Sequence, residues 1–332
     1  MKKRYEELDV LRGMAIIGVI LIHITSELID AQDNLGLFIN QAARFAVPVF
    51  LILSGLGLTL SNKINQGYFN FLWKQLSKII LLYFIWSVIY YTATSESYSI
   101  LGFIKGFILG ANYYHLYYVP IIIFLYLIYP LLLKLAKNLY GLATVLLVTV
   151  LSQLADILTG IEIFNNPLNV FNWAFYFALG IWLAHNFETK FKEIKRRKVL
   201  IAVLFTTMLF VLLVESYFLK ETTSMRPSVI LFSVLFVLLV LSVNWKNNVF
   251  KNLILKLSGL SYGIYLSHAL VLTIYEKVYK ELGFSWNSML YIIITFIVVA
   301  LLSIVLTVTG DKVILVINNI FVQETKQNKA GR

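Results

Sequence analysis

Ten long apolar segments recur along this chain of 332 residues, and they limit its fold more than any other feature. A helix of about 20 mainly apolar residues crosses the hydrocarbon core of a bilayer. Hydrophobic residues make up 59% of the sequence and charged residues only 14%, too few for the surface of a soluble domain. The sequence predicts an all-α polytopic transmembrane helix bundle with ten spans, at about residues 9–28, 38–60, 70–92, 115–134, 140–158, 169–186, 199–217, 227–244, 253–275 and 288–310.

The chain reads as one domain without internal repeats or low-complexity tracts. We expect residues 1–322 to form a single transmembrane domain and residues 323–332 a short polar cytoplasmic tail. The segment around 101–110 is too short to span, which favours a position in the interface or a re-entrant path. Cysteine is absent from the sequence, which excludes disulfides and thiolate metal sites.

Basic residues divide unevenly between the two sides of the predicted bundle. Of the 28 lysines and arginines, 21 fall on the side of the termini, 5 fall on the other side, and Arg12 and Arg44 lie within spans. Cytoplasmic loops carry the excess of basic residues, so both termini and residues 187–198 are predicted to be cytoplasmic and residues 93–112 to face outward. The net charge of +11 therefore reflects membrane topology, and nucleic acid is not expected as a partner.

Two ionisable residues, Arg12 and His23, interrupt the first apolar segment. They are 11 positions apart, within about 20° of three helical turns, so they share one face about 16 Å apart along the axis. Asp9 and Glu27 extend the same stripe by one turn at either end. Ionisable groups in a span usually face the bundle interior, so we expect Arg12 and His23 to line one cavity. The alternatives are that Arg12 snorkels to headgroups or pairs with Asp9, and that His23 is a packing residue.

Further motifs follow in order along nearly the whole chain: "VPVFLILSGLGLTL" (47–60), "YYHLYYVPIIIFLYLIYPLL" (113–132), "FYFALGIWLA" (175–184) and "LSGLSYGIYLSHALVL" (257–272). Together with Asp9, Arg12, Gly13 and His23, they resemble the membrane acyltransferase-3 family. The chain departs from the family pattern at Tyr117, where tryptophan is common. It also stops after the tenth span, whereas some relatives continue into an extracellular esterase-like domain.

The resemblance implies a bacterial cell-membrane enzyme with ten spans. It would transfer an acyl group, usually acetyl, from cytoplasmic acyl-CoA to a hydroxyl of a surface or lipid-linked glycan. Acetyl-CoA would be the donor substrate, with no permanently bound cofactor. The implied partners are the lipid bilayer, acyl-CoA, the glycan acceptor and a separate extracellular transferase or glycan-synthesis proteins. The competing interpretation is an exporter of exopolysaccharide, which the five prolines and the lack of repeat symmetry disfavour.

Three residues are candidates for the chemical step. Histidine titrates near neutral pH, so His23 is predicted to be a general base or a transient acyl carrier. Glu27 lies four residues further on, where it could orient the imidazole or stabilise its protonated form. Arg44 is interpreted either as the group that stabilises the oxyanion or as half of an ion pair with Glu27 or Asp30.

On the donor side, Arg12 has the permanent charge that suits a phosphate of acyl-CoA, and Asp9 and Ser54 are assigned to the same site. The expected substrate-binding residues are aromatic or imidazole side chains, for which a membrane-interface belt or core packing is the alternative: His115, Tyr117, Tyr118, Tyr265 and His268. No metal is expected, because the four histidines lie on different spans and form no i, i+4 pair.

Overall fold

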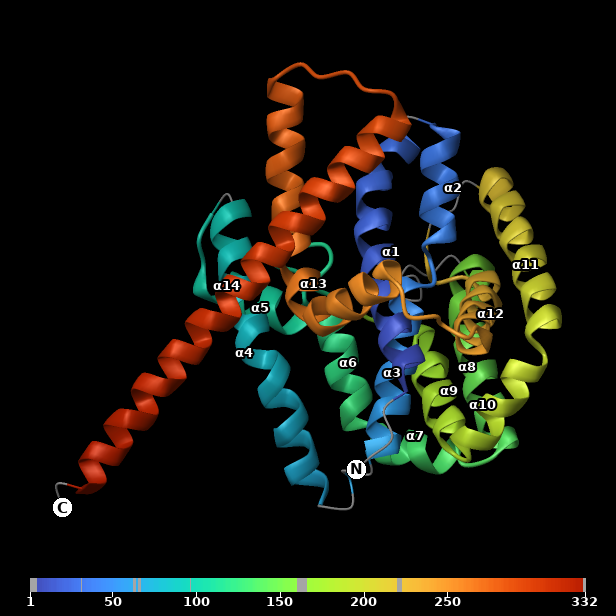
Figure 1. The fold of residues 1–332 in the computed structure, drawn as a ribbon, viewed down its shortest axis with the longest axis horizontal. Helices are drawn as coiled ribbons and strands as arrows, with labels where there is room; N and C mark the ends of the chain where they lie inside the picture. The colour runs from blue at the N-terminus through green and yellow to red at the C-terminus, as the bar shows by residue number, and fades with distance from the viewer. Residues whose placement is uncertain are drawn as a thin grey trace.

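The computed structural model describes residues 5–30, 32–61, 64, 67–95, 97–159, 166–219 and 223–330; the side chains of 30, 156–158, 219 and 313–330 are outside that description. These residues form helices and connecting turns, without strands among them (Figure 1). The helices are α1 (Glu6–Asp30), α2 (Asn34–Ala42), α3 (Ala46–Ser61), α4 (Tyr68–Thr94), α5 (Ile100–Leu109), α6 (Tyr118–Leu127), α7 (Tyr129–Leu135), α8 (Leu139–Thr159), η3 (Val170–Asn172), α9 (Ala174–Ala184), α10 (Phe187–Arg196), α11 (Lys198–Leu219), α12 (Pro227–Ser242), α13 (Val249–Glu281) and α14 (Ser288–Ala330).

Each of the ten predicted spans is helical, but the count of ten is not confirmed. Among the described residues, six segments are long and apolar enough to cross a membrane: α1, α2 with α3, α4, α11, α13 and the first part of α14. The segments predicted at 140–158, 169–186 and 227–244 contain shorter apolar helices, α8, α9 and α12. Helix α14 continues to Ala330, so it includes most of the segment predicted as a polar tail.

The predicted span 115–134 is broken into α6 and α7, which meet at an angle of 67°. Pro130 lies at the second position of α7 and explains the break. Its ring lacks the N–H that would continue the helical ladder, and it disfavours helical geometry at the residue before it. Together the two helices are long and apolar enough to cross a membrane, so they form either a broken span or a re-entrant segment.

The predicted short segment forms helix α5, which Ser99 caps at the start and Gly110 ends with a positive φ of 64°. Its apolar side chains are strongly exposed, including Ile100, Leu101 and Ile108. A ten-residue helix is too short to cross a bilayer, and an uncovered apolar face is typical of a helix that lies in the membrane interface.

Helices α1 and α13 lie in the interior, whereas α4 and α11 lie at the periphery (Figure 1). In α1 and in α13, 56% of the apolar stretch of 18 residues that could span the membrane is buried, against 17% in α4 and 22% in α11. Lipid tails are as apolar as leucine, so the outer helices can remain apolar on all faces. The interior helices carry the ionisable residues of the predicted site, which keeps those residues away from lipid.

Ion pairs between distant helices join residues that the topology prediction places on the same side of the membrane. Glu6 pairs with Lys251, and Glu7 pairs with Lys195 at 3.1 Å, all on the predicted cytoplasmic side. On the predicted outer side, Lys280 approaches Glu27 to 2.8 Å. These pairs agree with the division of charges, and which side is cytoplasmic stays a prediction.

The crossing of α3 with α9 is unusually close because each helix presents a glycine to the backbone of the other. A Cβ added to Gly55 would lie 2.1 Å from the carbonyl oxygen of Phe177. A Cβ added to Gly180 would lie 2.0 Å from the carbonyl oxygen of Ile52. Small residues let transmembrane helices pack backbone against backbone. This contact holds Ser54, which precedes Gly55, against the interior of the bundle.

Single cysteines in the natural cysteine-free chain can test the topology. We expect Ala111→Cys to react with a membrane-impermeant maleimide in intact cells, because residues 93–112 are predicted to face outward. Lys192→Cys should react only after permeabilisation. Labelling with the opposite pattern would show that the orientation is wrong.

The glycine crossing gives a stability prediction. Gly180→Ala should lower the free energy of unfolding by about 1–3 kcal/mol, because the new methyl group meets backbone that must move. Gly57→Ala is the matched control on α3, since a Cβ there has nothing within 4 Å. Alanine should leave stability unchanged or raise it slightly at that position. Thermal denaturation of the detergent-purified variants measures both, and equal stability of the two variants would contradict the packing argument.

Candidate functional site

Arg12 lies on α1 at the edge of an internal cavity of about 210 Å³. Its guanidinium donates to a carboxylate oxygen of Asp9, one turn earlier, at 3.1 Å, which is the pairing that the sequence left open as an alternative. The side chain of Arg12 remains 40% exposed, which leaves part of the guanidinium available to a ligand. The cavity wall is formed by Arg12, Val19, Val47, Phe50, Ser54, Ile79, Tyr118, Val119, Ile122, Tyr126, Ser261, Tyr262 and Tyr265.

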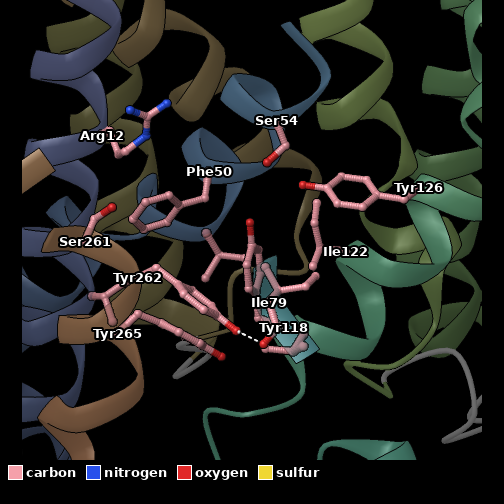
Figure 2. Close-up of a pocket in the computed structure, with 13 residues that line it drawn as sticks. Arg12, Phe50, Ser54, Ile79, Tyr118, Ile122, Tyr126, Ser261, Tyr262 and Tyr265 are labelled. Atoms are coloured by element: carbon pink, nitrogen blue, oxygen red, sulfur yellow. Dashed lines mark hydrogen bonds between the residues drawn. The ribbon is translucent and has the colours of Figure 1, made fainter. Parts of the chain in front are cut away.

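Residues with hydroxyl groups from three helices, α3, α6 and α13, line this cavity (Figure 2). The hydroxyls of Ser54 and Tyr126 face each other, and Ser54 also hydrogen-bonds Tyr118. Tyr262 is turned aside and donates to the carbonyl oxygen of Ile79 at 2.8 Å. The rest of the wall is apolar. The cavity can therefore hold a narrow, mostly apolar ligand with a few hydrogen-bonding groups, and an anion next to Arg12.

A second cavity of about 250 Å³ adjoins the first and shares Arg12, Phe50, Ser54 and Tyr126 with it. Gln75 lines this second space, and its amide nitrogen is buried without a hydrogen-bond partner in the described part of the chain. A buried donor without a partner is costly unless a ligand or water accepts from it. Sequence analysis missed Gln75, although an amide between Lys74 and Lys78 at the start of an apolar span was a detectable signal.

Three of the four histidines meet on the outer side of Tyr265. The ring centroids of His23 and His268 are 5.2 Å apart, and those of His268 and His115 are 5.1 Å apart. They come from α1, from α13 and from the turn before α6. The sequence predicted that His268 or Arg44 lies beside His23 in the wall of one cavity, and the contact of His23 with His268 agrees with that prediction. Among the described residues, no group of three or more His, Asp or Glu has the geometry to hold a metal ion.

His23 is half-buried, and its outer face meets Tyr114, whose ring centroid is 4.9 Å away. Tyr114 is 51% exposed, so this tyrosine separates His23 from the outside of the bundle. His115 and His268 are buried. Neither nitrogen of His115 makes a hydrogen bond of ordinary geometry among the described residues, although the ring interacts with the backbone of Leu266. The cluster is therefore a group of imidazoles in apolar surroundings, reached from the outer side at His23.

Tyr90 of α4 organises the helix that carries His268. Its hydroxyl accepts from the amide of Leu270 at 3.0 Å and donates to the carbonyl of Leu266 at 2.8 Å. These two backbone groups would bond each other in a regular α-helix. A side chain inserted into the helical ladder is a recognised cause of bending, and α13 changes direction along its length in Figure 1. His268 lies within the turn that Tyr90 opens.

Arg44 lies in the break between α2 and α3, inside a buried polar network. It donates to the amide oxygen of Asn40, whose amide nitrogen donates to the hydroxyl of Thr25 at 3.0 Å. The adjacent Gln41 accepts from Arg226 at 2.8 Å. Arg44 is close enough to His23 for the two charges to interact. The buried Arg226 and its link to Gln41 are further features that sequence analysis missed.

The hydrogen bond of Glu27 joins it to a lysine and not to His23. Its carboxylate is half-exposed and bonds the ammonium of Lys280 at 2.8 Å. It is therefore not the partner of Arg44, and the side chain of Asp30, the other predicted partner, lies outside the described residues. The orientation of His23 by Glu27 stays a prediction.

The predicted residues form two adjoining groups and not one cavity. The inner group contains Arg12, Asp9 and Ser54, and the outer group contains the three histidines. His23 is absent from the wall of the Arg12 cavity, so one cavity shared by the two residues stays a prediction. Tyr265 belongs to both groups, since it lines the cavity and its ring centroid is 5.3 Å from His115.

Two tyrosines complete the placement of the predicted residues. The ring centroid of Tyr118 is 5.6 Å from that of Tyr265, in the cavity wall. Tyr117 packs against Trp173, with ring centroids 6.3 Å apart, and interacts with Arg44. Tyr117 and Tyr118 thus pack inside the bundle, whereas Tyr114 is exposed.

Comparison with known proteins agrees with the resemblance seen in the sequence motifs. The model of the acyltransferase-3 family, described as an acyltransferase domain, matches residues 5–308. The chain is 24% identical to a protein of Staphylococcus aureus strain MSSA476 named "Probable poly-beta-1,6-N-acetyl-D-glucosamine export protein", over 89% of each chain. It is 25% identical to the protein of the same name in strain MRSA252, again over 89% of each chain.

A further relative is the amino-acid racemase of Enterococcus faecalis, which is 26% identical over 87% of this chain and 44% of its own length. No solved structure matches the chain significantly. The family match extends through α1, which carries Arg12 and His23, and through α13, which carries His268. The helical bundle, the ordered motifs and this match lead to one conclusion: the chain belongs to the acyltransferase-3 family of membrane proteins.

Proposed function

We propose that this protein transfers an acyl group, with acetyl the expected one, from cytoplasmic acyl-CoA to a hydroxyl of a surface or lipid-linked glycan. The observation that carries the proposal is the position of Tyr265 between two sites. On one side of it lies a narrow cavity that begins at a guanidinium, and on the other a cluster of imidazoles that begins near the outer surface. Donor and acceptor can therefore approach one reaction centre from opposite sides of the membrane.

The inner cavity suits the donor. The exposed part of the Arg12 guanidinium can form charge-assisted hydrogen bonds to a phosphate of CoA, and Gln75 offers a further donor nearby. The mostly apolar wall beyond them suits the flexible arm that ends in the thioester. Ser54 and the facing tyrosines supply hydroxyl groups along that path.

The outer cluster suits the acceptor. A hydroxyl that passes Tyr114 would meet the ring of His23 first. A neutral imidazole in these surroundings can take the proton of the acceptor hydroxyl as its oxygen attacks the acyl carbon. The carbon–sulfur bond then breaks, and the departing thiolate takes up a proton to become the CoA thiol. Arg44, which acts electrostatically on this region, is the group that we assign to the negative oxygen of the intermediate.

Export of exopolysaccharide is the second candidate, because the Staphylococcus aureus relatives carry the name of an export protein. The two functions predict different cell surfaces. Mass spectrometry of surface glycans, with and without the gene, separates them. A loss of acyl groups at an equal quantity of glycan supports transfer, whereas a loss of the glycan itself supports export.

Substitutions should separate the roles of Arg12 and His23. Arg12→Ala should weaken acyl-CoA binding about 10- to 150-fold, the equivalent of about 1.5–3 kcal/mol for a lost charge-assisted contact. Arg12→Lys should restore only part of this loss, because an ammonium cannot make the planar bidentate contact. His23→Ala should abolish acyl transfer with little change in the Kd for acyl-CoA.

Binding and turnover of the purified variants in nanodiscs measure these effects. Arg197→Ala is the matched control for Arg12, since Arg197 is an exposed arginine paired with Glu193 on the cytoplasmic side. His185→Ala is the control for His23, because His185 lies at the end of α9 outside the cluster. Full turnover by His23→Ala, or wild-type binding by Arg12→Ala, contradicts this division of roles.

A further inference from the structure

We propose that His268 is the second base of the reaction, which receives a proton from His23, and that Tyr90 is the positioning residue that holds it there. This inference rests on the proposed acyl transfer. It assigns a task to two buried groups that substrate binding alone leaves unexplained: the unpartnered Nε2 of His268 and the Tyr90 hydroxyl inside the ladder of α13.

The hydrogen bonds of His268 determine its tautomer. Its Nδ1 lies 2.7 Å from the carbonyl oxygen of Tyr265 and 3.2 Å from that of Ile264. Carbonyl oxygens only accept, so Nδ1 carries the hydrogen, and in the neutral ring Nε2 has a free lone pair. Nε2 is buried and has no hydrogen-bond partner among the described residues. His268 is thus a base that is ready to accept a proton.

His23 is the neighbour from which this proton can come. Its ring centroid is 5.2 Å from that of His268, at an interplanar angle of 36°. Two adjacent imidazoles at this separation exchange a proton after a small ring rotation or through one water. When one nitrogen of His23 takes the proton of the acceptor hydroxyl, its other nitrogen gives a proton to Nε2 of His268. His23 is then neutral again, and His268 is the cation.

The surroundings favour the positive charge on His268 over His23. The guanidinium of Arg44 acts on His23 as a like charge. His268 instead keeps the two carbonyl oxygens of Tyr265 and Ile264 at its Nδ1–H, and hydrogen bonds of this kind strengthen when the donor is charged. The proton leaves His268 again when the CoA thiolate takes it up, so the exchange balances without an added reagent.

Tyr90 acts on this relay only through the backbone. Its hydroxyl lies between the carbonyl of Leu266 and the amide of Leu270 and bonds both. These two residues lie two positions before and two positions after His268. Without that hydroxyl, α13 can close its regular bond and straighten, which moves the imidazole relative to His23. Tyr90 is fully buried and its ring stays packed on Tyr113 at 4.4 Å, so phenylalanine can fill the same space.

The first test uses substitutions of His268. We expect His268→Ala and His268→Gln to lower kcat for acyl transfer about 10²- to 10⁴-fold while the Kd for acyl-CoA stays unchanged. His185→Ala should keep wild-type kcat. Retention of full kcat by either His268 variant would overturn the relay. A loss of acyl-CoA affinity as large as the loss of kcat would overturn it as well.

Chemical rescue separates a base from a packing group. Added imidazole should restore part of the activity of His268→Ala by entering the vacated space. Pyrazole has the same shape but is a far weaker base, so it should restore little. Equal rescue by the two compounds, or rescue by neither, would show that the ring at position 268 does not act as a base.

A double-mutant cycle tests the positioning role. Tyr90→Phe should lower kcat at least 10-fold in the natural sequence, yet cause no further loss in the His268→Ala background, because it acts through His268. Multiplied losses in the double variant would overturn the assignment of Tyr90. A merely structural loss would appear in both backgrounds.

The failure of the relay can be told apart from the failure of the proposed function. If the natural protein transfers no acyl group from acetyl-CoA or succinyl-CoA to a glycan acceptor, both proposals fall. If it does transfer and His23→Ala abolishes the activity, while His268→Ala turns over at the natural rate, only the relay falls.

Discussion

The candidate site depends on the hydroxyl of Tyr90 inside the backbone ladder of α13. A transmembrane helix has no water with which to satisfy an opened pair of backbone groups, so a break is tolerated only where a protein group replaces the lost bond. Tyr90 supplies both a donor and an acceptor at one atom. His268 lies midway between the two backbone groups that Tyr90 bonds, and its ring lies against those of His23 and His115.

Polar groups inside an apolar bundle are the second constraint. Several of them here bond partners on other helices, as Asn40 bonds Thr25 and as one nitrogen of Arg226 bonds Gln41. Some of the exceptions lie where the two proposed substrates would meet, at Gln75 beside the inner cavity and at imidazole nitrogens of the cluster, and others lie elsewhere in the bundle. Unpaired buried groups are costly in a low-dielectric interior, so a ligand that bonds Gln75 or the imidazoles would lower that cost.

Part of this arrangement was predictable from the sequence. The position of each apolar helix and the pairing of Arg12 with Asp9 follow from hydropathy and from helical spacing, which are local properties. The lengths of the helices were less predictable. Pro130 breaks one predicted span, and α9 and α12, most of whose residues are buried against neighbouring helices, are shorter than a span. The outer pairing of Glu27 with Lys280 joins residues 253 positions apart, and spacing along α1 gave no sign of it.

The sequence by itself determined that the chain lies in a membrane, which of its segments are helical, and that Arg12 and His23 share a face, since these depend on composition and on the 3.6-residue period. Only the tertiary structure decided what each of the two residues meets. Arg12 borders a cavity with Ser54, whereas His23 meets His268, because α13 is bent and α3 packs closely on α9 through Gly55 and Gly180. Such contacts join residues far apart in the chain, and no local pattern records them.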